Sequence, residues 1–302
     1  MSAVDAPVEA TAATTSSRSA SDLRREVRRE SMRSVGRSLG RALLNAVVTL
    51  AIVLALWQGV VSFGGISPYV AKGPVDVWNH LFVTDPDAFA TAAERRADLV
   101  TLLWVTLEDS ALGFVVGMVI AVLLAMAFTL SKTVEAGVMP LALLLRSIPL
   151  VSIAPVIMLL TGRGTSASVA VIGTIVVLFP ALASVLFGLS QANRQSLDLV
   201  RVYGGGSVAA LLKVAIPGAL PSLFAAARVS VPGAVTGALL AEWLSTGQGI
   251  GGNIVKFNSA AQFDNLWACV AMITLITLVL YNLVQLVENL VLAEMGMSQR
   301  TT

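Results

Sequence analysis

The chain has 302 residues, of which 56% are hydrophobic and 13% are charged, and its mean hydropathy is +0.82. Soluble domains carry about 25% charged residues, so the composition argues against a water-soluble fold and for a core that faces lipid. The single cysteine, Cys269, lies in an apolar run, and the single histidine, His80, has no Cys or His partner. Disulfide frameworks and the usual zinc sites are therefore excluded.

Residues 1–42 are rich in Ala, Ser, Thr and Arg, and eight arginines precede the first long apolar run. Because no apolar stretch follows the initiator Met, we predict that this segment is not a signal peptide. We expect residues 1–20 to be disordered and residues 21–42 to form a polar or interfacial helix on the cytoplasmic surface. Nucleic-acid binding is the lesser interpretation of the arginines, and no nucleic-acid partner is predicted.

A helix needs about 20 mostly apolar residues to cross a bilayer core of about 30 Å. Six segments satisfy this rule: 43–63, 111–130, 136–160, 166–189, 222–243 and 265–289. The third contains three prolines and should be kinked. We predict an all-α, polytopic membrane protein of about six transmembrane helices, with a transmembrane domain over 43–295 and a C-terminal tail over 296–302.

Lysine and arginine positions predict the orientation. With the N-terminus inside, 14 of them fall on the cytoplasmic side and 5 outside, while Arg146 lies within the membrane. The positive-inside rule then places both termini in the cytoplasm. The stretch 64–110 becomes an external loop with a short helix around Val75–Val83, and Glu108 and Asp109 form a polar step before the second span. Gly113 and Gly117 predict close helix packing.

The segment 190–221 joins the fourth and fifth predicted spans. Residues 198–202 suggest one helix, Gly204–Gly206 interrupt it, and Ser207 can cap a second short helix that ends before Pro217. Such an element at the cytoplasmic face presents a short helix to another protein.

These residues resemble the inner-membrane permease subunits of binding-protein-dependent, ATP-driven importers. Asp198 takes the acidic position of that family's cytoplasmic signature, Gly204 its glycine, and Ile216–Pro217 its hydrophobic-proline pair. Leu199 and Val200 depart from the pattern, where two alanines are usual. Further segments look like the branch that serves nitrate, sulfonates, taurine and thiamine precursors: Arg146-Ser-Ile-Pro149, Phe179–Pro180, Ala241-Glu-Trp243, Gly249-Ile-Gly251, and Glu288 at the end of the last span.

The resemblance implies a type I importer permease fold whose short cytoplasmic helix, here about Gly205–Val214, docks in a groove of a separate ATPase. It also implies an external binding protein, a homodimer or a heterodimer of permeases, contact with membrane lipid, and a bacterial inner-membrane location. ATP and magnesium would bind the partner, so no cofactor is expected on this chain. The residues expected to couple to the ATPase are Asp198, Tyr203, Gly204, Gly205, Gly206, Ser207, Leu211 and Pro217.

Four residues are expected on the translocation pathway or its gate: Arg146, Ser147, Pro149 and Glu242. Arg146, near the middle of the third span, either attracts an anionic substrate or, as we favour, ties the kinked helix to neighbouring carbonyls or a carboxylate. Glu242 and the glycines after it form either an external gate or an interfacial acid beside a flexible loop.

The leading hypothesis is an importer permease without enzymatic activity of its own, since no Walker-type sequence is present. It would carry a small organic or inorganic solute, such as a sulfonate-, nitrate- or taurine-like anion or a small heterocycle. An ion-coupled secondary transporter is the alternative, but it would use intramembrane acids or histidines, which the spans largely lack. An intramembrane enzyme would need paired acids or an activated nucleophile there.

Overall fold

The computed structural model describes residues 48–84 and 90–295. The predictions for the basic tail, its interfacial helix and the C-terminal tail lie outside these residues. The chain divides into two units, Met1–Gly65 and Ile66–Thr302. The described part of the first unit is the apolar helix Val48–Phe63, which falls within the first predicted span.

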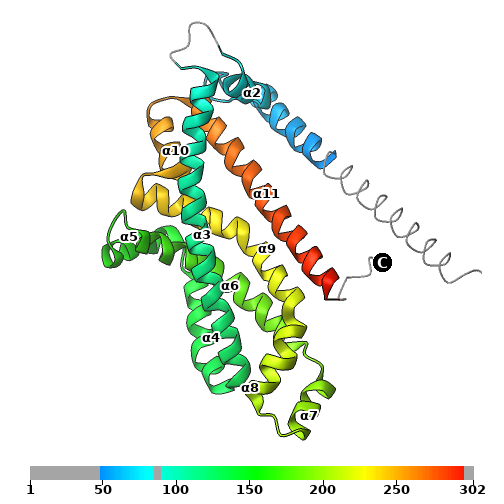
Figure 1. Ribbon diagram of the computed structural model, residues 1–302. Coiled ribbons are helices and arrows are strands. Elements are labelled where there is room, and N and C mark those ends of the chain that lie inside the picture. Colours follow the sequence, from blue (N-terminus) through cyan, green and yellow to red (C-terminus); the bar gives the residue numbers. More distant parts are fainter. Residues whose placement is uncertain (1–47, 85–89, 296–302) are drawn as a thin grey trace, which may run out of the picture. The chain divides into compact units, whose positions relative to one another are not determined.

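The second unit is helical, with no strand among its described residues. Its elements, labelled in Figure 1, are α2 (Pro74–Phe82), α3 (Ala92–Leu130), α4 (Lys132–Ser147), α5 (Leu150–Thr161), α6 (Ser166–Ser190), α7 (Arg194–Val202), α8 (Ser207–Ala210), a π-helical turn η1 (Leu211–Ala215), α9 (Ile216–Ala241), a second π-helical turn η2 (Glu242–Thr246), α10 (Gly249–Ser259) and α11 (Phe263–Glu294).

Small side chains hold α3, α6 and α9 together. On α3 the buried residues recur every four positions, from Gly113 and Gly117 through Ala121 to Ala125, and so form one face of the helix. A Cβ atom added to Gly113 would lie 2.8 Å from the Cα atom of Gly173 on α6. The backbones therefore approach too closely for any side chain, and the close packing predicted from the glycine pair is confirmed.

Gly113→Ala is expected to destabilise this helix pair, because neither backbone can move away without disturbing the core. Overpacking of this kind costs about 1–3 kcal/mol. The matched control is Gly137→Ala on α4, where an added Cβ meets nothing within 4 Å; this change should stabilise by about 0.5–1 kcal/mol. Thermal unfolding in detergent measures both, and equal shifts in the two variants would contradict the expectation.

The helix that contains the second predicted span is longer than that span. Helix α3 begins at Ala92, so Glu108 and Asp109 lie inside one continuous helix, and the polar step at these two residues stays a prediction. The start is fixed by a capping box in which Thr91 accepts from the Glu94 backbone N–H (3.2 Å) and its own N–H donates to the Glu94 carboxylate (2.7 Å). The short helix predicted around Val75–Val83 is confirmed as α2, and its external position stays a prediction.

The third predicted span is two helices. Helix α4 ends at Ser147 and α5 begins at Leu150, with Ile148 extended and Pro149 as the N-cap. A proline disfavours the α conformation in the residue before it, so the chain breaks here, whereas Pro140 and Pro155 are tolerated inside their helices.

Within residues 48–84 and 90–295, four helical segments are long and apolar enough to cross a membrane: Ala92–Leu130, Ser166–Ser190, Ser207–Thr246 and Phe263–Glu294. The last contains Glu288, which is thus inside the final helix. Its carboxylate forms an ion pair of 3.2 Å with Arg228 of α9, and both side chains are largely removed from solvent. Arg228 therefore lies within a spanning helix and joins α9 to α11.

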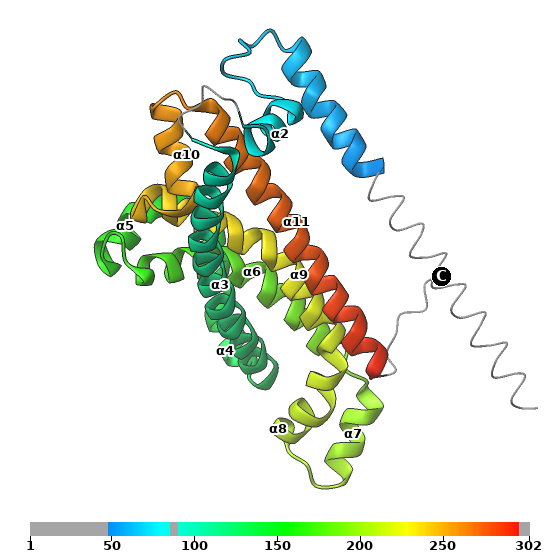
Figure 2. The same cartoon turned by 45° about the horizontal axis from the view of Figure 1, so that its top comes forward.

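In both views α7 and α8 lie at one end of the second unit and α2 and α10 at the other (Figures 1 and 2).

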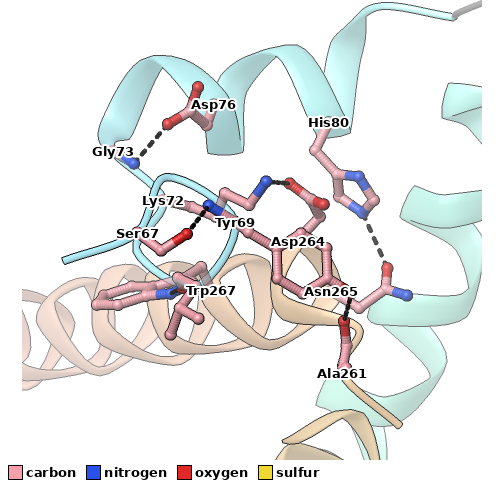
Figure 3. Close-up of polar contacts among 11 residues, drawn as sticks. Ser67, Tyr69, Lys72, Gly73, Asp76, His80, Ala261, Asp264, Asn265 and Trp267 are labelled. Atoms are coloured by element: carbon pink, nitrogen blue, oxygen red, sulfur yellow. Dashed lines mark hydrogen bonds and ion pairs between the residues drawn. The ribbon is translucent and has the colours of Figure 1, made fainter. Parts of the chain in front are cut away.

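At the end that carries α2, the segment from Ser67 to His80 is fastened to the start of α11 (Figure 3). We call these contacts the clasp. The Tyr69 hydroxyl donates to the Ala261 carbonyl (3.1 Å), Lys72 pairs with Asp264 (3.1 Å), and His80 Nε2 lies 2.8 Å from Asn265 Oδ1. Ala261 has a φ of 56°, a left-handed conformation that a non-glycine residue adopts only where its surroundings hold it.

Acidification is expected to loosen the clasp. Burial lowers the pKa of His80 from its ordinary value of 6.5; Arg95 and Lys72 add to this effect, while Asn265 and Asp264 oppose it. The folded state disfavours the charged imidazole of His80. The stability that the neutral imidazole contributes to the fold is therefore complete above pH 6.5, and it is lost as the pH falls through the lower pKa of the folded state.

The hydrogen-exchange protection factors of residues 261–267, which correct for the intrinsic pH dependence of exchange, measure this loss at about pH 7.5 and 5.5, on either side of the ordinary histidine pKa of 6.5. His80→Gln keeps a donor for Asn265 without a titrating group, and so should remove the pH dependence. Equal pH dependence in both proteins would contradict a role for His80.

Candidate functional site

The predicted coupling loop folds as two helices around a glycine turn. Asn193 caps the start of α7, because its side chain accepts from the Gln195 N–H (2.9 Å), and the helix ends at Val202. Gly204 has a φ of +81° and its N–H donates to the Arg201 carbonyl at 2.9 Å. Only glycine adopts this conformation without steric cost, so the turn between α7 and α8 requires a glycine at position 204.

The loop exposes apolar side chains where a partner can reach them. Tyr203 is 84% exposed and Val208 56% exposed, whereas Leu211 is only 3% exposed and packs in the core with α3, α6 and α9. Of the predicted coupling residues, five lie on the accessible surface: Asp198, Tyr203, Gly204, Gly206 and Ser207. The Leu211 side chain is buried and does not itself present a surface to a partner. Three exposed apolar residues that are not among the expected coupling residues complete this surface: Val202, Val208 and Leu212.

Two details of the second short helix differ from the prediction. Its N-cap is Gly206, in extended conformation, and Ser207 is the first helical residue and not the cap. Nor does the helix stop before Pro217, since the π-helical turn η1 carries the chain directly into α9. Proline lacks the N–H that an α-helix would use there, and the wider π turn before it accommodates this loss. Asp198 pairs with Arg201 (3.1 Å) on the exposed side of α7.

Glu242 lies at the other end of α9, in the π-helical turn η2, and is fully buried. Its Oε2 accepts from the Gly251 N–H of α10 at 2.6 Å, and on α3 Thr106 Oγ1 accepts from the neighbouring Ile250 N–H at 2.9 Å. Oε1 is buried and has no hydrogen-bond partner among the described residues. The interpretation of Glu242 as an interfacial acid is therefore wrong.

Ser245, one turn after Glu242, connects η2 to two further segments, the α5–α6 connection and α6. Its hydroxyl accepts from the Gly164 N–H of the α5–α6 connection (2.9 Å) and lies 2.9 Å from Ser168 Oγ of α6. Together with the Glu242 contacts these bonds form what we call the polar node, which links α3, α6, α10, η2 and the α5–α6 connection. No local pattern in the sequence indicated Thr106, Ser168 or Gly164.

The glycines after Glu242 are not a flexible loop. Gly249, Gly251 and Gly252 belong to α10 and are buried. A Cβ at Gly249 would collide with the Glu242 carboxylate, and one at Gly251 would collide with the Leu239 backbone. They are small because α10 packs directly on the carboxylate and on α9. Gly247, with a φ of 65°, makes the turn between η2 and α10.

Arg146 lies in the last turn of α4, just before the break at Pro149. Its guanidinium carbon is 4.5 Å from the centroid of the Phe179 ring on α6, a cation–π contact. Ser147 Oγ donates to the Leu144 carbonyl at 2.8 Å within its own helix. The favoured interpretation was that Arg146 ties the kinked helix to neighbouring carbonyls or a carboxylate. Arg146 does contact a neighbouring helix, but the partner is the aromatic face of Phe179.

Comparison with known proteins gives consistent matches. Residues 113–295 match the family model described as the binding-protein-dependent transport system inner membrane component. A probable ABC transporter permease protein of Haemophilus influenzae is 29% identical over 230 residues, covering 75% of this chain and 87% of the relative. The formylaminopyrimidine transport permease protein ThiX of Halalkalibacterium halodurans is 25% identical over 227 residues, covering 74% and 86%.

Among solved structures, an amino acid ABC transporter crystallised with histidines matches with a TM-score of 0.52. The identity is 16%, and the match covers 65% of this chain and 95% of the other. At this identity the match bears on the fold alone, and it agrees with the all-α polytopic architecture described above.

Proposed function

The chain belongs to the family of binding-protein-dependent transport inner membrane components, and from that premise we propose how its two ends divide the work of transport. It is a multi-pass inner-membrane permease of an ABC importer, without enzymatic activity of its own, and ATP is hydrolysed by a separate subunit. The matches give no support to an ion-coupled transporter.

The α7–α8 end is the docking surface for the ATPase. The observation that carries this assignment is the exposure of Tyr203, Val202 and Val208 around a glycine turn, because an apolar surface at the end of a bundle requires a partner. ATP and magnesium bind that partner and not this chain. We place this end, and both chain termini, in the cytoplasm.

The polar node is the external gate of the pathway. Glu242 fastens α10 to η2, Thr106 fastens α10 to α3, and Ser245 fastens the α5–α6 connection to η2. Breaking these few hydrogen bonds would release two segments together. Arg146 positions the end of α4 beside α6 and shapes the pathway without carrying the gate. Two permeases, either identical or paralogous, enclose the pathway, surrounded by membrane lipid.

The solute is a small organic or inorganic molecule delivered by an external binding protein. One relative is named for formylaminopyrimidine transport, a small heterocycle. The resemblance to the sulfonate and taurine branch extends the class to small anions. Selectivity belongs chiefly to the binding protein, so this chain needs a pathway of suitable size more than a specific pocket.

Purification of the tagged chain from its native membrane tests the proposal. We expect a stoichiometric ATPase to copurify and to hydrolyse ATP in the complex. A stable, folded chain that recovers no ATPase would make the α7–α8 end an ordinary connector and remove the basis of the assignment.

A further inference from the structure

Helix α2 carries large apolar side chains on the side that faces away from the protein. Val75, Trp78 and Phe82 follow one another at helical spacing and are 63%, 62% and 49% exposed. The inward side also has an apolar residue, Val77, which is 6% exposed, beside His80, which contacts Asn265. Apolar side chains therefore lie on both sides of α2, whereas a surface helix in water keeps its outward side polar.

The outward stripe is held in a fixed position. The Trp78 and Phe82 rings stack with centroids 4.3 Å apart, and the guanidinium of Arg96 lies 5.3 Å from the Phe82 centroid. Arg96 also donates to the Leu81 carbonyl at 2.8 Å, and the clasp fastens the other side of α2. The aromatic rings are therefore presented in one arrangement, without further loss of conformational freedom on binding.

The contacts of α2 also fix its level along the transmembrane helices. Lys72 and His80 reach Asp264 and Asn265, the last polar residues before the apolar part of α11 begins at Leu266. Both views show α2 beside that end of α11 (Figures 1 and 2). The surface of a bilayer that surrounds α11 must therefore cross the molecule at about the height of α2.

We propose that α2 is a lipid-binding interfacial helix, in which Val75, Trp78 and Phe82 insert between the headgroups and the first acyl carbons of one leaflet. Tryptophan concentrates at this depth in membrane proteins, and amphipathic helices lie there with their apolar face buried by about 5–10 Å. A lipid surface is the partner that the position favours. The exposed apolar residues of α11 that follow, Leu275, Leu278 and Val279, face the same medium.

Site-directed spin labelling tests this inference. Cys269 is the only cysteine and is buried, so Cys269→Ala provides a background without reactive thiols. Labels at Val75→Cys and Phe82→Cys are measured in nanodiscs of phosphatidylcholine and phosphatidylglycerol. The matched control is Val202→Cys on α7, an exposed valine of the proposed aqueous end.

We expect the ratio of oxygen to nickel-complex accessibility to be several-fold higher at positions 75 and 82 than at 202. A ratio equal to that of the control would show that the stripe meets water, where it would be open to a protein partner, and would overturn the proposal. Trp78→Phe gives a second measurement in a conservative variant. Bromine-labelled acyl chains should quench less of the total tryptophan emission in this variant than in the native protein, and unchanged quenching would also contradict insertion.

Discussion

Val208→Asp is expected to abolish ATP-dependent uptake while the protein folds and inserts normally. Val208 is the second residue of α8 and its side chain is more than half exposed. An aspartate in the first turn of a helix interacts favourably with the helix dipole, by about 0.3–1 kcal/mol, so the helix itself should not suffer. A charge in an apolar docking surface, by contrast, must be desolvated when the partner binds.

The readouts are copurification of the ATPase and uptake into proteoliposomes. Val208→Thr, which keeps the shape without a charge, is the matched control and should retain most of the activity. Wild-type ATPase recovery and uptake in the aspartate variant would rule out this surface as the docking site. Loss of membrane insertion would instead point to a folding defect, which the position of Val208 argues against.

Glu242→Ala is expected to release α10 and to reduce uptake more than ten-fold. It removes the acceptor of the Gly251 N–H, which is buried, and an unpaired buried donor costs about 1–3 kcal/mol. The space left by the side chain adds a cavity beneath the glycines of α10. Thermal unfolding, proteolysis of the 247–262 segment and uptake measure the three consequences.

Glu242→Gln separates a positioning role from an ionic one. The amide carbonyl can still accept from Gly251, and the amide nitrogen replaces Oε1, a buried acceptor that has no hydrogen-bond partner among the described residues. One unpaired buried polar group therefore takes the place of another, at a comparable desolvation cost. We therefore expect near-native stability and uptake. Loss of uptake with native stability in the glutamine variant would show that the carboxylate charge is needed. Thr106→Val, which deprives Ile250 of its acceptor, should give an intermediate effect.

The apolar runs predicted the fourth and last spans within a few residues, because their helices contain long stretches without charges. The start of α3 was missed because charges from Glu94 to Asp109 interrupt the hydropathy. Helix formation does not require an apolar sequence there, since this stretch packs against α2 and α10. The Thr91–Glu94 capping box was the local signal that marks the true start.

The candidate site was predictable at one end only. The glycine turn at Gly204 has a local signature, and the sequence located it. At the other end, the glycines from Gly247 to Gly252 indicated a loop, because glycine normally weakens a helix. The helical conformation of Gly249–Gly252 depends on contact with Glu242 and with the α9 backbone. The hydrogen bonds of Thr106 and Ser245 join residues 77 or more positions apart, which no local pattern reveals.

The helix that runs from Ser207 to Thr246 without a loop has a mechanical consequence. Its 40 residues extend about 60 Å at 1.5 Å per residue, and they carry Val208 at one tip and Glu242 at the other. A rod of continuous backbone hydrogen bonds resists compression, so a push on one tip arrives at the other instead of being absorbed between them. The two π turns interrupt the regular α-helical hydrogen bonds close to the two ends of this rod. The first contains Leu212 of the docking surface and the second contains Glu242 and Ser245 of the polar node, so the rod can bend only beside the surfaces that it joins.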